Sequence, residues 1–196
     1  MTDERLRRWI SAVLATPGLT AIRDPDEAWR VHVEQSLAAV PLVRELEGEI
    51  VDVGSGGGAP GIPLAAALPD REVTLLEANG RKAAFLERAA AAFPNVRVVR
   101  GRAEEQAIET YGVAVAKALA LPPVAAELCL PLVRVGGAAL LFAGPSADAR
   151  AVSAAAAKLG GGPAEEREGF LVIPKIAPTP PGFPRRPGMA AKRPLA

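Results

Sequence analysis

The most constraining feature of this sequence is a glycine-rich segment that directly follows a short apolar run. The run Ile50–Val53 contains Asp52, and the next eight residues, Gly54–Gly61, include five glycines. A short apolar run bounded by turn residues predicts a buried strand, and glycine permits a sharp turn and a close approach of backbone to ligand. Because open parallel sheets bind ligands at the carboxyl ends of their strands, the segment predicts a ligand-binding turn in an α/β sheet.

The chain beyond this turn alternates apolar runs with helical patterns. This alternation predicts a mostly parallel sheet covered by helices on both faces, and right-handed crossovers then give a doubly wound, Rossmann-like α/β fold. We expect the last strand, which follows a helix and the linker Gly160–Gly162, to form an antiparallel edge. The predicted strands are 50–53, 72–77, 96–99, 113–118, 138–143 and 169–176, and the predicted helices between them are 62–67, 81–92, 121–133 and 147–159.

Two amphipathic helices are predicted ahead of the sheet. The first spans residues 3–15, and Pro17-Gly18 ends it. The second begins with Asp24 as N-cap and Pro25 in the first turn, and Pro41 breaks or kinks it. We therefore expect a small N-terminal helical extension at residues 1–44 and the α/β domain, with its C-terminal segment, at residues 45–196.

The charges are unevenly distributed, although the formal net charge is only +1. Five bases and no acid lie between Lys175 and the C-terminus, so the rest of the chain has an excess of four acids. Seven of the 19 prolines lie from Pro174 onward, which predicts an extended surface segment without helix or central strand. A basic tail can bind phosphate, although a merely solvated tail is also compatible with this pattern. Its candidate phosphate contacts are Arg185, Arg186 and Lys192.

Cysteine usage and the pattern of charges indicate the cellular compartment and exclude some classes of site. The single cysteine, Cys129, lies in an apolar stretch and cannot form a disulfide within the chain. No metal-ligand spacing is present, and the longest apolar stretch is interrupted by charges and prolines, so we expect neither a metal site nor a membrane span. With a charged N-terminus that does not resemble a signal peptide, the chain is expected to be cytoplasmic.

The strand ends suggest which ligand the glycine turn binds. Glu77 ends the second predicted strand, and its carboxylate can accept hydrogen bonds from both hydroxyls of a ribose. Ala103 and Glu104 follow the third strand and can border an adenine edge. Together with the turn formed by Asp52, Gly54 and Gly56, these residues favour an adenosine without phosphate groups, as in S-adenosylmethionine.

Two alternatives for the turn stay open. A nicotinamide cofactor also binds a glycine-rich turn, although the chain is short, lacks a second catalytic domain, and has no lysine four residues after its one tyrosine, Tyr111. The turn could also bind no ligand.

Several motifs together resemble those of the RsmG (GidB) family of bacterial 16S rRNA guanine-N7 methyltransferases. The resemblance extends from about residue 18 to residue 195, and its most specific parts are the Pro-Gly-Ile-Pro segment of the glycine-rich loop and the C-terminal signature. The matching segments are Leu19–Pro25, Asp52–Leu64, Gly101–Glu105, Pro178–Pro180, Phe183–Gly188 and Lys192–Leu195, with His32 and Ser36 in the second helix.

The resemblance implies a class I S-adenosylmethionine-dependent methyltransferase acting on the 530-loop guanine, position 527, of 16S rRNA or of the small subunit. It implies cofactor contacts at Gly54, Ala59, Ala103 and Glu104. The chain departs from the family at Lys117, where many members have arginine, at Ala143, where lysine is frequent, and at Gln35, where the family has an acid.

Guanine N7 has an in-plane lone pair and carries no proton, so its alkylation requires no general base. Catalysis is then expected to come mainly from proximity and orientation. Lys117 ends the fourth predicted strand beside the expected cofactor, and we expect it to contact the cofactor and to donate a hydrogen bond to guanine O6 or to a neighbouring phosphate.

Two other functions stay open: a small-molecule methyltransferase and a non-catalytic ribosome-binding homologue. The basic tail favours an RNA substrate over a small molecule. The protein is expected to act as a monomer.

Overall fold

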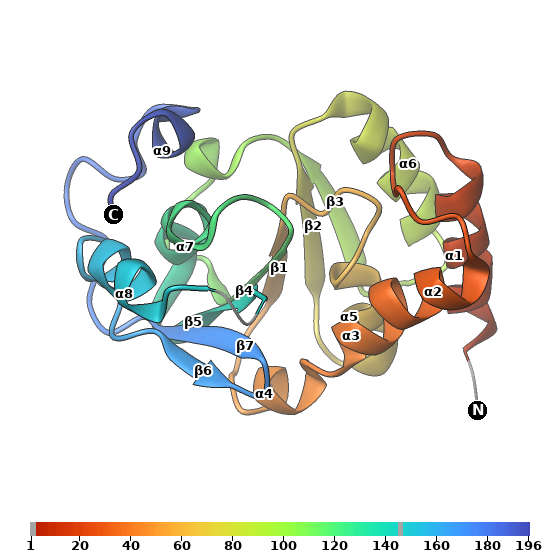
Figure 1. Ribbon diagram of the computed structural model, residues 1–196, viewed down its shortest axis with the longest axis horizontal. Helices are drawn as coiled ribbons and strands as arrows, with labels where there is room; N and C mark the ends of the chain where they lie inside the picture. Colours follow the sequence, from red (N-terminus) through yellow and green to blue (C-terminus); the bar gives the residue numbers. More distant parts are fainter. Residues whose placement is uncertain (1–2, 145–146) are drawn as a thin grey trace.

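The computed structural model describes residues 3–144 and 147–196. Its seven strands are β1 (Ile50–Val53), β2 (Val73–Glu77), β3 (Val96–Arg100), β4 (Tyr111–Lys117), β5 (Val133–Phe142), β6 (Glu165–Arg167) and β7 (Phe170–Pro174). They form one sheet with the order β3-β2-β1-β4-β5-β7-β6 (Figure 1). The first five strands are parallel, whereas β7 pairs antiparallel with both β5 and β6. The predicted doubly wound α/β fold with an antiparallel edge is therefore confirmed.

Helices cover both faces of this sheet (Figure 1). The α-helices are α1 (Glu4–Ala15), α2 (Pro25–Trp29), α3 (Gln35–Leu37), α4 (Val40–Arg44), α5 (Gly61–Ala67), α6 (Gly80–Ala90), α7 (Pro122–Cys129), α8 (Ala149–Ala157) and α9 (Met189–Lys192). The π-helix η1 (Arg30–Glu34) joins α2 to α3, and the 3₁₀ helices are η2 (Ala103–Glu105) and η3 (Leu130–Leu132). Helices α5, α6 and the N-terminal helices pack on one face, and α7 and α8 pack on the other.

Alternate side chains of each central strand point to opposite faces and enter two separate hydrophobic cores. Ile50 and Val113 belong to the core beneath α5 and α6, whereas Val51 and Ala114 belong to the core beneath α7 and α8. A strand buried on both faces reads as a continuous apolar run. This double burial explains why these strands were recognisable in the sequence.

Several details differ from the sequence-based expectations. The predicted helix 121–133 ends at Cys129, and β5 begins at Val133 rather than at residue 138. The short exposed strand β6 was not predicted, because its residues Glu165–Arg167 are all charged. The second predicted helix is divided into several pieces, and Pro41 lies in the first turn of α4 rather than ending a helix. The tail was expected to contain no helix, yet Met189–Lys192 forms α9, in a stretch between two prolines where every residue retains its backbone N–H.

The N-terminal helices pack directly onto the glycine-rich loop. Trp9 of α1 is only 3% exposed, and its indole Nε1 donates a hydrogen bond to the carbonyl oxygen of Gly57 at 2.9 Å. Buried side chains of α1 and α4 share one hydrophobic core with β1. A boundary at residue 44 stays a prediction, and residues 1–2 and 145–146 of the two expected domains lie outside the described residues.

Within residues 3–144 and 147–196, no helix combines the length and the apolar character that crossing a bilayer requires.

Candidate donor and acceptor sites

A cavity of about 360 Å³ opens at the carboxyl ends of β1, β2 and β4. The strand order reverses between β1 and β4, and ligands bind at such a switch point in open α/β sheets. The volume lies within the usual range for small-molecule sites. We call this cavity the donor crevice. Its walls include Val53, Gly54, Leu76, Glu77, Ala78, Lys82, Gly101–Glu104, Ala118–Ala120, Val124, Leu128, Gly188, Ala190 and Ala191.

Gly54 forms the floor where β1 enters its turn. Its φ of +71° lies in the left-handed region that favours glycine, and a Cβ there would lie 2.4 Å from Cδ1 of Leu119. Any side chain at this position would therefore displace the Leu119 side chain, which lines the crevice.

Glu77 supplies the main polar group of the crevice and is held rigidly. One carboxylate oxygen accepts from the backbone N–H of Gly56 at 2.9 Å, and the other accepts from that of Asn79 at 2.7 Å. The side chain is 8% exposed. Each carboxylate oxygen can accept a further hydrogen bond, so Glu77 can bind the two hydroxyls of a ribose. Gly54, Glu77 and the small side chain of Ala103 thus fit an adenosine.

The C-terminal segment closes one side of the donor crevice. Glu104 accepts a hydrogen bond from the backbone N–H of Gly188 at 2.9 Å, and this contact brings Gly188, Ala190 and Ala191 to the wall. Sequence reasoning missed these tail residues, because nothing in their composition indicates contact with a residue 84 positions away. It also missed Leu119, although the rule that selected Glu77, a residue at a strand's carboxyl end, also applies to the loop after β4.

Four residues expected to contact the cofactor lie outside the wall of the donor crevice: Asp52, Gly56, Ala59 and Lys117. Gly56 acts through its N–H on Glu77, and Ala59 packs against the hydrophobic core. Asp52 is 1% exposed, and one carboxylate oxygen accepts from the N–H of Gly61 at 3.0 Å. Its other oxygen is buried without a hydrogen-bond partner among the described residues. Burial raises the pKa of the Asp52 carboxyl to about 7.

Lys117 lines a different hollow of about 350 Å³, which we call the acceptor hollow. Its ammonium donates a hydrogen bond to the carbonyl oxygen of Val31 in the π-helix and lies 5.6 Å from the ring centroid of Phe142. Burial lowers the pKa of Lys117 to about 8, against the attraction of Asp52. The other residues of the hollow are Gln35, Ala38, Phe142–Gly144 and Glu168–Phe170.

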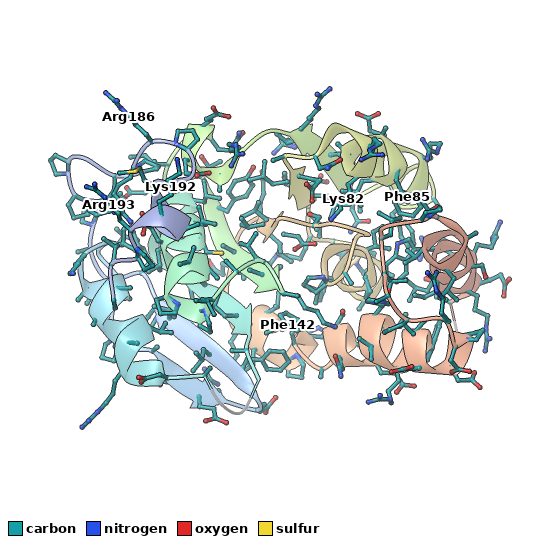
Figure 2. All side chains as sticks on the ribbon, turned by 45° about the horizontal axis from the view of Figure 1, so that its top comes forward. Lys82, Phe85, Phe142, Arg186, Lys192 and Arg193 are labelled. Carbon is teal, nitrogen blue, oxygen red and sulfur yellow. The ribbon has the colours of Figure 1, made fainter. Side chains whose placement is uncertain are left out.

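Two phenylalanines from neighbouring strands form an aromatic corner of the acceptor hollow. The rings of Phe142 and Phe170 meet edge to face, with centroids 4.8 Å apart and planes at 83°. Phe142 lies near the middle of the molecule in Figure 2. An aromatic corner beside a lysine and the amide of Gln35 can hold a planar base and hydrogen-bond its edge.

Consecutive residues at the end of β4 line the two hollows. Lys117 faces the acceptor hollow, and the next three residues, Ala118–Ala120, line the donor crevice. Ala118 has a φ of +51°, which is unusual for a residue with a Cβ. This local turn directs consecutive residues into adjacent cavities.

In the basic tail, Arg185 forms an ion pair that the sequence did not predict. Its Nε and Nη2 both donate to the carboxylate of Glu127 at 2.6 Å, and Nη2 also donates to the Arg193 carbonyl oxygen at 2.8 Å. Arg185 therefore anchors the tail to α7, and the phosphate contact expected of it stays a prediction. Arg186 and Lys192 are exposed, as a phosphate contact requires. Over the described ranges, no group of three or more histidine, cysteine or acidic side chains is placed to hold a metal.

The doubly wound sheet with its antiparallel edge is the fold of class I S-adenosylmethionine-dependent methyltransferases. A solved structure with the same fold is a predicted O-methyltransferase, protein Atu636 from Agrobacterium tumefaciens. It superposes with a TM-score of 0.56 at 23% identity and covers 71% of this chain and 78% of its own.

The family model described as GidB, rRNA small subunit methyltransferase G, matches residues 4–159. Ribosomal RNA small subunit methyltransferase G of Moorella thermoacetica is 39% identical over 198 residues, which cover 90% of this chain and 82% of the relative. The protein of the same name from Roseiflexus castenholzii is 38% identical over 97% of this chain and 87% of its own length. The chain therefore belongs to the family of rRNA small subunit methyltransferase G, and S-adenosylmethionine is its methyl donor.

Proposed function

We propose that this enzyme methylates N7 of the 530-loop guanine, position 527, of 16S rRNA. The observation that carries the proposal is the adjacency of the two hollows at the end of β4. A methyl group held in the donor crevice and a base held beside Lys117 would face each other across Ala118. An in-line displacement needs this arrangement, because the reacting atoms must be aligned near contact distance.

The geometry of the crevice supports the following donor contacts. Glu77 accepts hydrogen bonds from the ribose hydroxyls, Ala103 and Glu104 border the adenine, and Gly54 leaves space beside Leu119. Asp52, Gly56 and Ala59 do not line the crevice and act by fixing the conformation of the glycine-rich loop. S-adenosylmethionine supplies a methyl group bonded to a positively charged sulfur.

The acceptor needs orientation rather than deprotonation. Guanine N7 offers its lone pair directly, so no residue has to remove a proton. The Phe142 ring gives the base an aromatic surface, and Lys117 exchanges the Val31 carbonyl for guanine O6 or a neighbouring phosphate. Lys117 is the catalytic residue in this scheme because it touches the acceptor.

The exposed tail cations Arg186 and Lys192 supply phosphate contacts near the donor crevice. RNA binding that depends on them should weaken as salt increases, since bound counterions are released on association. We infer action in the cytoplasm as a monomer, with 16S rRNA or the small subunit as substrate.

The proposal is tested by incubating the purified protein with labelled S-adenosylmethionine and unmethylated 16S rRNA or small subunits. Base-specific cleavage and primer extension then locate N7-methylguanine. We expect one modification, in the 530 loop. Label at another atom or position, or transfer to free guanosine with equal efficiency, would overturn the proposal.

A further inference from the structure

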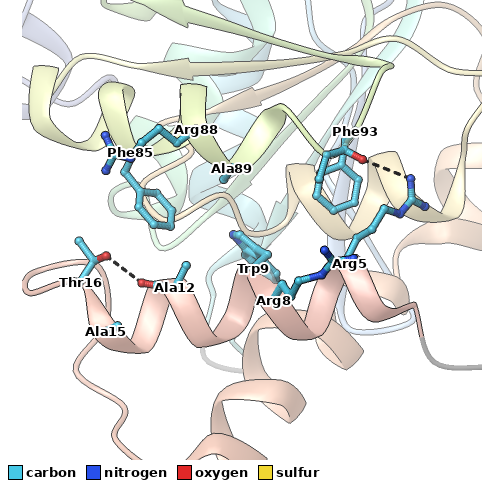
Figure 3. Close-up of a pocket in the computed structure, with 11 residues that line it drawn as sticks. Arg5, Arg8, Trp9, Ala12, Ala15, Thr16, Phe85, Arg88, Ala89 and Phe93 are labelled. Atoms are coloured by element: carbon cyan, nitrogen blue, oxygen red, sulfur yellow. Dashed lines mark hydrogen bonds between the residues drawn. The ribbon is translucent and has the colours of Figure 1, made fainter.

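A third hollow lies outside both sites, in a groove between α1 and α6 (Figure 3). At about 410 Å³ it is larger than the donor crevice. Arg5, Arg8 and Trp9 of α1 form one wall, and Phe85 and Arg88 of α6 form the other. Alanine side chains from both helices line the space between these walls, so the groove has an apolar floor and three arginines at its rim.

Two of these arginines, Arg8 and Arg88, form no ion pair with an acid among the described residues. Arg5 is paired with Asp3 at 2.6 Å and lies over a phenylalanine ring. Arg8 and Arg88 are exposed, and Arg88 donates a hydrogen bond to a carbonyl of its own helix, that of Ala84. Over residues 3–144 and 147–196, no carboxylate lines the groove or forms an ion pair with either side chain. The rim is therefore complementary to an anion.

One wall of the groove continues to the donor crevice, and the other contacts the glycine-rich loop. Lys82 of α6 lines the donor crevice, and Phe85, about one turn further along the helix, lines the groove. On the other wall, the indole N–H of Trp9 donates a hydrogen bond to the carbonyl oxygen of Gly57 in the glycine-rich loop. The tail cations Arg186 and Lys192 lie at the opposite end of the molecule from α1 and α6, with the two sites between them (Figures 1 and 2).

We propose that the groove between α1 and α6 binds a single-stranded stretch of the substrate rRNA on the side of the acceptor guanine away from the tail. Arg8 and Arg88 contact its phosphates, since guanidinium groups bind phosphate oxygens in a bidentate manner. The apolar floor accommodates the sugar and base surface of a single strand. This inference rests on the proposed rRNA substrate, and it gives the RNA two anchors, one on each side of the reacting base.

The test removes the charges of Arg8 and Arg88 together, in the full-length variant R8A/R88A. A 16S rRNA fragment that contains the 530 loop is titrated with protein at several salt concentrations. Because a single strand contributes a salt slope of about 0.7 per phosphate contact, two lost contacts should lower the slope by about 1.4. We expect the fragment to bind about 5- to 20-fold more weakly at low salt, while the affinity for S-adenosylmethionine stays unchanged.

A matched control, R44A/R150A, removes the same charge from two exposed positions outside the groove. It should keep the RNA affinity of the wild type to within about twofold. An equal loss in both variants, or no loss in R8A/R88A, would overturn the groove proposal. Normal binding of naked RNA with weaker binding of assembled subunits would also overturn it and would point to a ribosomal protein. Methylation by the wild-type enzyme is measured separately, so failure of the proposed substrate is distinguishable from failure of the groove.

Discussion

At the scale of single residues, the proposed role of Lys117 can be tested by substitution. Its ammonium is held by the Val31 carbonyl, and Asp52, His32 and Glu168 are the titratable groups around it. For Lys117→Ala we expect kcat to fall about 10- to 100-fold, because a hydrogen bond from a charged donor contributes about 1.5–3 kcal/mol. The affinity for S-adenosylmethionine should change little, since Lys117 lies outside the donor crevice. Single-turnover methyl transfer measures the first quantity and calorimetric titration the second; unchanged transfer would remove Lys117 from the mechanism.

Asp52 predicts an unusual pH dependence of stability. Its pKa is near the ordinary value of 3.8 in the unfolded chain and about 7 in the folded protein. Between these values the folded state holds a proton that the unfolded state has lost, so raising the pH destabilises the fold. One pKa unit corresponds to about 1.4 kcal/mol, so the free energy of unfolding should fall by roughly 2–4 kcal/mol between pH 4 and pH 8.

The measurement is urea unfolding of the wild type and of Asp52→Asn across that pH range. The amide cannot ionise, so the variant should lack this component of the pH dependence. The difference between the two curves isolates Asp52 from other titrating groups such as His32. A difference that is flat with pH would show that the Asp52 carboxyl titrates normally.

At the scale of the element, the turn between β1 and α5 depends on having no side chain at Gly54. Gly54→Ala places a Cβ 2.4 Å from Leu119 and a side chain at a φ of +71°. We expect at least a 10-fold loss of affinity for S-adenosylmethionine. Gly18→Ala is the matched control: its φ is +84°, but no atom lies within 4 Å of the added carbon. The control should lose about 1 kcal/mol of stability through backbone strain and keep its cofactor affinity, as isothermal titration would show.

How far the sequence predicts an element depends on whether the cause is local. The buried strands β1 and β4 were predictable because burial on both faces leaves a continuous apolar run. Glu77 and Ala103 could be placed at the crevice because parallel strands bring their carboxyl ends to one edge. The sequence could not show that Asp52 lies outside the crevice wall. Its carboxylate is oriented by a hydrogen bond that it accepts from the backbone N–H of Gly61, which forms only in the folded loop. The groove arginines could not be grouped either, because α1 and α6 meet only in the tertiary structure.

In the C-terminal segment, contacts between residues far apart in the sequence could not be predicted either. Its charge and proline content indicated an exposed basic tail, and Arg186 and Lys192 fit that description. The composition could not distinguish Arg185 from its neighbour Arg186. The partner of Arg185, Glu127, lies 58 residues away in a helix whose sequence is otherwise apolar.

At the scale of the whole molecule, the Arg185–Glu127 ion pair helps to hold the tail, which closes the donor crevice, against α7. Glu127 is 4% exposed, so Glu127→Gln leaves a partly buried guanidinium without its counter-charge. We expect the free energy of unfolding to fall by about 1–3 kcal/mol, less than for a fully buried pair, because Arg185 is partly exposed. The wall formed by Gly188, Ala190 and Ala191 should loosen with it. The affinity for S-adenosylmethionine should then fall about 5- to 10-fold, which corresponds to about 1–1.4 kcal/mol.

Glu45→Gln is the matched control for this prediction, because it breaks an equally simple ion pair, to Arg167 at 2.8 Å, at exposed positions outside the donor crevice. It should change stability by less than about 1 kcal/mol and leave cofactor affinity as in the wild type.

Calorimetric titration of both variants with S-adenosylmethionine, alone and with saturating 16S rRNA fragment, completes the test. If phosphate contacts at Arg186 and Lys192 hold the tail in place, RNA should restore part of the affinity that Glu127→Gln has lost, since two ligands that favour one tail position bind cooperatively. If Glu127→Gln leaves the affinity for S-adenosylmethionine unchanged, the crevice wall does not depend on the ion pair between Arg185 and Glu127. The tail would then contribute to RNA binding and not to cofactor binding.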